Sequence, residues 1–289
     1  MSTRLFRWSM VALLLGLFVA GGSAQQAETP LYVVVTYQKV LPGQGDAYRA
    51  HLTGMAKKFW QEAMNLNPNL VHWSSARVMY KGIDEGQGQD FDYVSASVTN
   101  GPPPEPGGNM DAVFAKLGTT QAEYGKTLSA MRTVVGTEVL RRGAGTSATG
   151  TGTSKEGDFR VSNQIRIKSG MGSEYWDRAR TLTQPTMQEA VAQGDLKGWS
   201  MWGRVFPSGA ATAYDVMTVT THKSLASTLD AGSTPNRGLE RFMKANPGKS
   251  YSSYVTNGNE YSEMQRRTIT QVVALVERAA AAGRTSENR

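Results

Sequence analysis

The chain has 289 residues, no cysteine and a formal net charge of +7. The absence of cysteine excludes disulfide bonds, cysteine-ligated metals, thiol catalysis and thioether attachment of haem. The basic residues are spread along the chain and form none of the runs of about five to eight that favour nucleic-acid binding, so no nucleic-acid partner is expected. The length allows two domains with cores of ordinary size.

The first 24 residues have the pattern of a secretory signal peptide. Arg4 and Arg7 precede an apolar run from Met10 to Ala20, and small residues end the segment at Ala24. The apolar run has about half of the roughly 20 residues that a membrane span needs. We therefore expect cleavage after Ala24, a periplasmic or secreted location, and no membrane partner for the mature chain.

A segment of small and polar residues divides the remaining sequence. Residues 143–158 are mostly glycine, serine and threonine, a composition typical of a flexible linker. Their glycines fit neither of the common phosphate-binding spacings. We expect one module over residues 25–142, a second over residues 159–278, and a disordered tail over residues 279–289.

The two modules repeat one another. Their first halves align without a gap for about fifty residues at an offset of 127, so that Tyr48 corresponds to Tyr175 and Arg77 to Arg204. After a loop that is four residues longer in the first copy, Asp92 corresponds to Asp215. Collinear identities of this kind indicate a duplicated sequence.

Strand and helix patterns follow in the same order in each copy. A β-rich run leads through a glycine-containing turn into a helix whose apolar stripe should face a sheet. The complete order, strand-helix-strand-strand-helix-strand, is that of a ferredoxin-like module. The expected strands are residues 31–41, 70–80, 91–98 and 137–141 in the first copy and 159–167, 197–206, 214–221 and 272–276 in the second, and the later helical regions are 110–134 and 239–267.

The strands carry large apolar side chains on both faces. In the second strand of the second copy, Trp199 and Met201 lie on one face and Trp202 on the other. A sheet with one face in water would alternate apolar and polar residues. Both faces must therefore be covered, and the other module is the simplest cover. We predict an α+β fold in which two ferredoxin-like modules pack sheet to sheet as an intrachain α/β barrel.

These features resemble the dimeric α/β-barrel superfamily of ferredoxin-like proteins, in a tandem, exported form. The likeness rests on the duplicated order, the turn Leu41-Pro42-Gly43, the run Gly198–Trp202 and the strand start Tyr214-Asp215-Val216. It covers nearly the whole mature chain. The superfamily includes cofactor-free oxygenases, lactone isomerases and haem-degrading and haem-binding enzymes, so the likeness implies a fold and leaves the chemistry open.

Five residues are candidates for ligand binding. The repeated pairs Arg77–Asp92 and Arg204–Asp215 can face one another across hairpins. They are either ion pairs that fix the register or arginines that bind an anionic ligand in the barrel. The tryptophans are either core residues or the walls of an aromatic pocket. The predicted ligand-binding set is Tyr37, Arg77, Trp199, Trp202 and Arg204.

Histidines are weaker candidates for catalysis. The chain has three, His51, His72 and His222, without the spacing of a metal site, so no metal is expected. His51 and His72 are candidates for a general base or a haem ligand because imidazole titrates near neutral pH. No cofactor is expected, with haem as the alternative. In haem-binding relatives the second module supplies an axial histidine, and His222 is the only histidine there.

The second module has the features that most favour function. Pro185 stands where the first copy has Lys58, and it predicts either a kink that opens space between helix and sheet beside Trp199 or a tolerated packing defect.

The irregular segment from Gly101 to Gly108 is either a lid or a spacer.

We predict a protein that binds a small aromatic or anionic molecule in or beside the barrel. The first alternative is an enzyme similar to cofactor-free oxygenases or isomerases, and the second is a non-catalytic interaction platform with filled barrels. The chain is expected to be a monomer with an internal pseudo-dimer, or a homo-oligomer.

Overall fold

The computed structural model describes residues 29–82, 90–104, 110–146, 154–209, 212–230 and 235–278. The predicted signal peptide and tail lie outside these ranges, as do the middle of the predicted linker and part of the proline-rich segment. Of the helices within these ranges, none is long and apolar enough to cross a membrane.

Eight antiparallel strands form a closed barrel. They are β1 (Leu31–Val40), β2 (Leu70–Lys81), β3 (Tyr93–Asn100), β4 (Arg132–Gly145), β5 (Phe159–Ile167), β6 (Gly198–Phe206), β7 (Val216–His222) and β8 (Ser262–Glu277). The order around the barrel is β1-β3-β2-β8-β5-β7-β6-β4, which keeps each module's four strands together in ferredoxin-like order. The modules join where β2 pairs with β8 and β4 pairs with β6, so neither sheet keeps a free edge. The predicted α+β class and intrachain barrel are confirmed.

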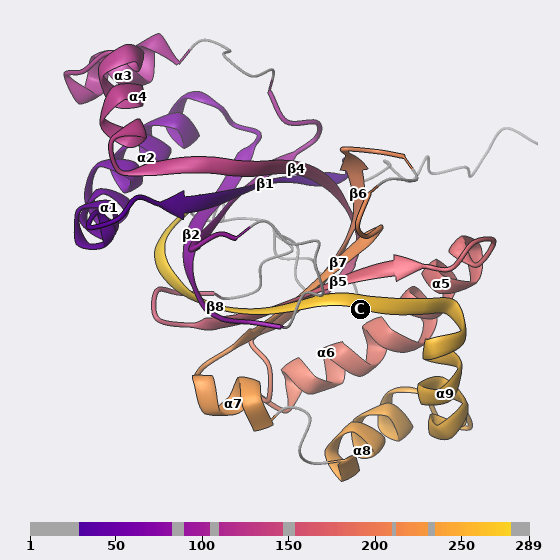
Figure 1. The fold of residues 1–289 in the computed structure, drawn as a ribbon. Helices are drawn as coiled ribbons and strands as arrows, with labels where there is room; N and C mark the ends of the chain where they lie inside the picture. Colours follow the sequence, from indigo (N-terminus) through magenta and orange to yellow (C-terminus); the bar gives the residue numbers. More distant parts are fainter. Residues whose placement is uncertain are drawn as a thin grey trace, which may run out of the picture.

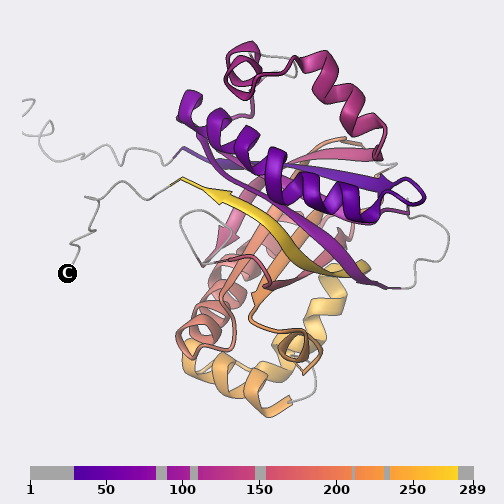
Figure 2. The ribbon, with the colours of Figure 1, turned by 90° about the vertical axis from the view of Figure 1, so that its left-hand side faces the viewer.

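Helices cover the barrel on two opposite sides (Figure 1). The first module supplies α1 (Gly45–His51), α2 (Lys57–Leu66), α3 (Asp111–Leu117) and α4 (Gln121–Ser129), and the second supplies α5 (Gly172–Arg178), α6 (Gln184–Ala192), α7 (Leu225–Asp230), α8 (Pro235–Ala245) and α9 (Tyr251–Tyr261). The π-turn η1 (Leu52–Ala56) joins α1 to α2, and η2 (Ala179–Thr183) joins α5 to α6. Figure 2 shows the barrel between the two helical layers.

The repeat is visible in the helix boundaries. α1 begins at residue 45 and α5 at residue 172, and η1 begins at residue 52 and η2 at residue 179, which gives the predicted offset of 127 each time. Pro185 lies in the first turn of α6, after η2. Since η1 makes the same π-turn before Lys58, the irregularity belongs to the repeated geometry and does not depend on the proline.

The aspartates of the predicted Arg–Asp pairs have other partners. Asp92 Oδ2 accepts the N–H of Val40 at 2.9 Å, and Asp215 Oδ2 accepts the N–H of Ile167 at 2.8 Å. Lys39 Nζ lies 3.3 Å from Asp92 Oδ1, and Arg166 Nη1 lies 3.8 Å from Asp215 Oδ1. The predicted ion pairs with the arginines of the second strands are therefore wrong, although the two aspartates are true counterparts.

The second strands align one residue away from the predicted match. Val78 donates its N–H to Asp92 O, and Arg204 donates its N–H to Asp215 O. The counterpart of Arg204 is thus Val78 and not Arg77. A register irregularity near the start of β2, absent from the β6–β7 pair, accounts for the shift. One residue reverses the face of a strand, so Arg77 lies on the outer face while Arg204 points into the barrel.

β4 continues into the segment predicted as a linker. Gly143 lies in this strand under the ring of Trp176, where a Cβ atom would come within 2.1 Å of the ring. At the other end of the segment, Ser154 and Asp158 are buried. Both ends are packed because β4 gains β6 as a partner and because Asp158 forms an ion pair with Lys197.

The helical region predicted over residues 239–267 is wrong at its C-terminal end. α9 stops at Tyr261, and β8 begins at the next residue. β8 pairs with β5 along its first part and with β2 along its second part, and this long-range pairing outweighs the local pattern. The region predicted as helical over residues 110–134 likewise ends early, because β4 begins at Arg132.

Three apolar clusters form the core. Burial of each large side chain stabilises the fold by about 1.5–3 kcal/mol. The cluster between helices and sheet is extensive in the first module and small in the second. The first-module cluster includes Tyr48, Leu52, Phe59, Met64, Trp73, Tyr93 and Phe114, the barrel cluster includes Val33, Val35, Leu140, Trp202 and Met217, and the second-module cluster is Ala144, Ala179, Trp199, Met201 and Val216.

Candidate functional site

Two cavities differ greatly in size. The cavity inside the barrel has a volume of about 90 Å³, and a pocket between the sheet and the helices of the second module has a volume of about 530 Å³. A water molecule takes about 30 Å³ in the liquid, and pockets for organic ligands have roughly 300–1,000 Å³. The barrel cavity therefore suits water or a small ion. The larger one, which we call the helix–sheet pocket, is the candidate site for an organic molecule.

The second module has smaller side chains at two repeated positions near the helix–sheet pocket. At the offset of 127, Leu52 corresponds to Ala179 and Phe59 to Thr186. Leu52 and Phe59 fill the first-module core, whereas Ala179 lines the pocket. The duplicated framework is thus kept while its second copy loses packing volume.

Aromatic side chains form much of the pocket wall. Burial raises the pKa of Tyr175 and of Tyr254, so both phenols stay protonated at neutral pH. A protonated phenol donates a hydrogen bond to an acceptor beside it. The wall thus offers flat apolar surface with a few donors, which suits an aromatic ligand. The aromatic lining residues are Tyr175, Trp199, Tyr254 and Tyr261.

The pocket is biased toward positive charge. Among the described residues that line it are Arg178, Arg241 and Arg267, and no aspartate or glutamate. Arg178 lies over the rings of Tyr254 and Tyr261, at 5.6 Å and 4.9 Å from their centroids, and donates to Tyr254 O at 2.9 Å. Arg241 forms an ion pair with an aspartate outside the lining. Arg178 and Arg267 donate hydrogen bonds to neutral oxygens, so their charge favours an anionic ligand.

His222 is the histidine of this pocket. It ends β7, it is 2% exposed, and its Nε2 lies 3.2 Å from Thr220 Oγ1. Burial lowers the pKa of His222, against the opposing effect of the Ser227 backbone. The imidazole is therefore neutral at pH 7 and able to accept a proton.

Haem fits these residues poorly. A haem iron needs an axial donor that points into open space, and His222 is the nitrogen donor that the lining offers. An iron atom at Nε2 would have to displace the contact with Thr220. Within the described residues, no cluster of three or more histidine, aspartate or glutamate side chains could hold a metal ion. We base no chemistry on haem, and an absorption spectrum of the protein purified from its own host tests for it.

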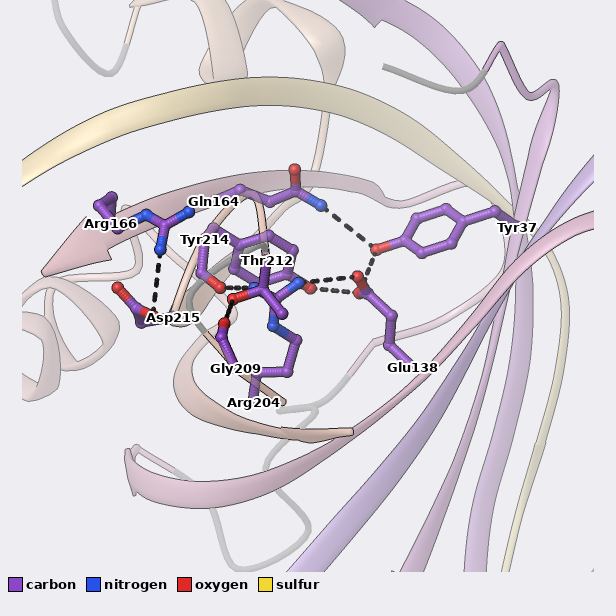
Figure 3. A network of polar contacts seen from close by, with 9 residues as sticks. All are labelled: Tyr37, Glu138, Gln164, Arg166, Arg204, Gly209, Thr212, Tyr214 and Asp215. Atoms are coloured by element: carbon purple, nitrogen blue, oxygen red, sulfur yellow. Dashed lines mark hydrogen bonds and ion pairs between the residues drawn. The ribbon is translucent and has the colours of Figure 1, made fainter. Parts of the chain in front are cut away.

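Glu138 organises a polar cluster at one end of the barrel (Figure 3). Its Oε2 accepts hydrogen bonds from Tyr37 OH, at 2.9 Å, and from Tyr214 OH. Arg204 Nη1 lies 3.5 Å from Oε1, and its guanidinium lies 4.1 Å from the centroid of the Tyr214 ring. Gln164 Nε2 donates to Tyr37 OH at 3.3 Å. Burial, followed by the charge of Glu138, raises the pKa of Tyr37. These groups satisfy one another inside the barrel.

His72 occupies a second polar chain inside the barrel. Its ring is fully buried, with Nδ1 3.0 Å from Glu277 Oε1 and Nε2 3.1 Å from Ser74 Oγ. His51 lies outside the barrel in the first helical layer, where Nε2 is 3.2 Å from Tyr124 OH. Neither ring lines the helix–sheet pocket.

The structure therefore separates the predicted ligand-binding residues. Tyr37, Trp202 and Arg204 lie in the barrel, Trp199 lines both the barrel cavity and the helix–sheet pocket, and Arg77 lies on the outer face of β2. Arg178 was not predicted from the sequence. It aligns with His51, so this repeated position carries a different ionisable side chain in each copy. Glu138 was not predicted either, because it belongs to none of the repeated pairs of the two copies.

Comparison with known proteins supports the fold. No family model matches the sequence, and no curated protein sequence matches it. A candidate monooxygenase from Fusobacterium nucleatum has a TM-score of 0.53 at 10% identity, over 88% of this chain and 97% of that one. An anthrone oxidase-like protein has a TM-score of 0.50 at 11% identity, over 89% and 98%. A candidate chlorite dismutase has a TM-score of 0.47 at 11% identity, over 84% and 95%. At these identities the likeness establishes the α+β barrel fold alone.

Proposed function

We propose that this chain is an enzyme that acts on a small aromatic molecule in the helix–sheet pocket by forming an anion of the substrate, without a bound metal. The observation that carries the proposal is the composition of the pocket, a volume of about 530 Å³ with aromatic walls, three arginines, one neutral histidine and no carboxylate among its described lining residues. Preorganised positive charge in a buried site stabilises an anion that forms during reaction.

The chemistry follows from the position of the charges. A neutral His222 accepts a proton from a C–H or O–H group that is activated by a neighbouring carbonyl or ring. Arg178 stabilises the resulting enolate or phenolate, and Trp199 provides a face for the ring. An enolate that is reprotonated at another carbon gives an isomerase. An enolate that passes its electrons to dioxygen gives an oxygenase without a cofactor, and the names of the monooxygenase and anthrone oxidase-like neighbours support the oxygenase part of this reading.

The test uses anthrone, an enolisable aromatic ketone, as the probe. Its CH₂ group becomes C=O while one dioxygen molecule supplies that oxygen atom and leaves the second as water. We expect oxygen uptake above the uncatalysed rate, lowered about a hundredfold or more in His222→Gln because a general base contributes roughly 10²–10⁴-fold. His51→Gln, which alters a histidine outside the pocket, should retain the wild-type rate.

Binding without turnover is the competing outcome. If native mass spectrometry shows that 1-hydroxy-2-naphthoate binds to the wild type and not to Trp199→Ala, while no variant changes oxygen uptake, the chain is a binding protein. An interaction platform requires filled interiors, and it would show neither binding nor turnover. Export of the chain remains part of the proposal and is tested by locating the mature N-terminus.

A further inference from the structure

Arg160 is a charged side chain inside the barrel whose nearest partners are neutral. It projects from β5 into the barrel and lines the cavity of about 90 Å³. Its Nη1 donates to Ser74 Oγ at 2.8 Å and its Nη2 donates to Ser154 Oγ at 3.1 Å. Within the described ranges, no carboxylate oxygen lies within 4.0 Å of its guanidinium nitrogens. An arginine in this position has its geometry fixed without having its charge neutralised at contact distance.

The acidic groups nearest to Arg160 are already engaged. Glu277 and Asp158 both attract the guanidinium, yet Glu277 is held by His72 Nδ1 and Asp158 by Lys197. Burial lowers the pKa of Arg160 to about 10, so the side chain remains charged at neutral pH. Arg160 is half-buried and has no contact partner for its charge, so an anion in the adjacent cavity would lower its desolvation cost.

Hydroxyl groups surround Arg160 on the inner wall. In the strand register Arg160 lies between Thr221 on β7 and Thr270 on β8, and Ser162 lies beside Thr268. Neighbours across strands have Cβ atoms about 4.5–5.5 Å apart. All five residues line the cavity. None of the four hydroxyls has a hydrogen-bond partner among the residues that the structure describes, so each can donate to a ligand in the cavity.

We propose that this end of the barrel cavity is a binding site for a small monoanion, with Arg160 as its cation and the hydroxyls of Thr221 and Thr270 as its flanking donors. The ligand class is a halide or a carboxylate no larger than formate or acetate, because the cavity has room for about three water molecules. The chain Glu277–His72–Ser74 holds the guanidinium in place. Arg160, Thr221 and Thr270 do not line the helix–sheet pocket, although Trp199 lines both cavities, and the proposal does not rest on the proposed enzymatic function.

The experiment compares thermal unfolding in sodium formate and in sodium pivalate at constant ionic strength. Formate fits the cavity and the branched pivalate does not, so only formate should raise the Tm of the wild type with saturating dependence on concentration. Arg160→Met removes the charge while keeping an extended side chain, and it should abolish this rise. Arg166→Met, on the same strand with a side chain that is 31% exposed, is the matched control and should keep it. A formate effect that persists in Arg160→Met, or that is equal for pivalate, would overturn the proposal.

A second pair of variants keeps the test decisive if Arg160→Met does not fold. Thr221→Val and Thr270→Val each remove one donor with little change of volume. Each should weaken the apparent affinity for formate about fivefold, the factor that corresponds to one hydrogen bond of about 1 kcal/mol. Unchanged affinity in both variants contradicts the site. Crystals soaked in bromide provide a direct readout, since an anomalous peak beside Arg160 supports the proposal and its absence at saturating bromide opposes it.

Discussion

Replacing Ala179 by leucine should close part of the helix–sheet pocket. Ala179 is 3% exposed and lines the pocket, whereas its counterpart Leu52 is also 3% exposed and packs in a full core. Leucine adds three carbon groups, and each buried group stabilises the fold by about 0.8 kcal/mol. We therefore expect Ala179→Leu to raise the free energy of unfolding by about 2 kcal/mol.

The two readouts of this variant should move in opposite directions. A gain of about 2 kcal/mol corresponds to a rise in Tm of about 4–8 °C for a chain of this size. Binding of 1-hydroxy-2-naphthoate, measured by isothermal titration calorimetry, should weaken about tenfold or more because the added side chain occupies the space of the ligand. A variant that is more stable and binds less well is the signature of a filled pocket.

Two controls distinguish a filled pocket from a general packing effect. Leu52→Ala in the first module should lower stability by about 2–5 kcal/mol, because it creates a cavity in a full core. Ala190 is 1% exposed, has no place in the pocket lining, and corresponds to an alanine in the first module. Ala190→Leu should therefore destabilise by about 1–3 kcal/mol. If Ala179→Leu loses stability as Ala190→Leu does and binds the naphthoate normally, the volume argument is refuted.

Four further substitutions test the contacts that hold the barrel together. Asp92→Ala and Asp215→Ala should each lower the free energy of unfolding by about 1 kcal/mol, since each removes the same hydrogen bond to a strand end. Burial lowers the pKa of His72, although the hydrogen bond with Glu277 opposes this shift. Below the ordinary histidine pKa of 6.5, the unfolded chain therefore binds more protons at this residue than the folded chain does. Stability should fall as the pH drops below about 6.5, and His72→Gln should reduce that slope. Glu138→Gln should destabilise by about 3 kcal/mol because it leaves the guanidinium of Arg204 buried without its carboxylate.

Chemical denaturation with matched controls checks these expectations. Asp90 has a side chain that is 67% exposed, and Asp90→Asn should change stability by less than about 1 kcal/mol. A loss for Asp92→Ala that is several times the loss for Asp215→Ala would contradict their equivalence. A pH slope in His72→Gln equal to that of the wild type would assign the acid sensitivity to other groups. A neutral effect of Glu138→Gln would show that Arg204 finds another partner.

The barrel was predictable because the duplication constrains it. Glycine-containing turns at Gly43 and Gly170, together with helix stripes at the same offset, fix the element order of both copies. Apolar residues on both strand faces require a cover for the inner face, and each module covers the other. These signals extend over whole strands and helices, so the few identical residues shared by the two copies were enough to detect them.

The face of each second-strand residue was not predictable in the same way. A register irregularity near the start of β2 moves the true match by one residue, so that Trp73 and not His72 corresponds to Trp199. Both tryptophans lie in the clusters between sheet and helices. An ungapped alignment cannot represent such an irregularity, and a shift of one residue places every side chain on the opposite face of the strand. This is why Arg77 was expected inside the barrel.

The pocket could be read from the sequence in part. Pro185 was expected either to open a space between helix and sheet beside Trp199 or to be a tolerated packing defect, and the structure has a π-helical turn before it in both modules. A further signal was the loss of bulk from Leu52 to Ala179, which lines the pocket, and the gapless part of the alignment already contained it. A smaller side chain indicates a pocket only when both aligned residues are known to face a sheet.

This asymmetry suggests how a duplicated fold can acquire a site without losing stability. The first module keeps Phe59, Phe114 and Tyr124 in contact, with ring centroids 5.3–5.6 Å apart, and so retains the packing of a full core. The second module keeps an aromatic contact there, with the ring of Phe242 4.7 Å from that of Tyr254, but it has Ala179 at the position of Leu52 beside the pocket. A cavity of this kind lowers stability in proportion to its volume. Because β2 pairs with β8 and β4 pairs with β6, the less packed module is held along two seams by the well-packed one. A ligand that fills the helix–sheet pocket should therefore stabilise the whole barrel against unfolding. If the two modules unfolded independently, the ligand would stabilise the second module alone.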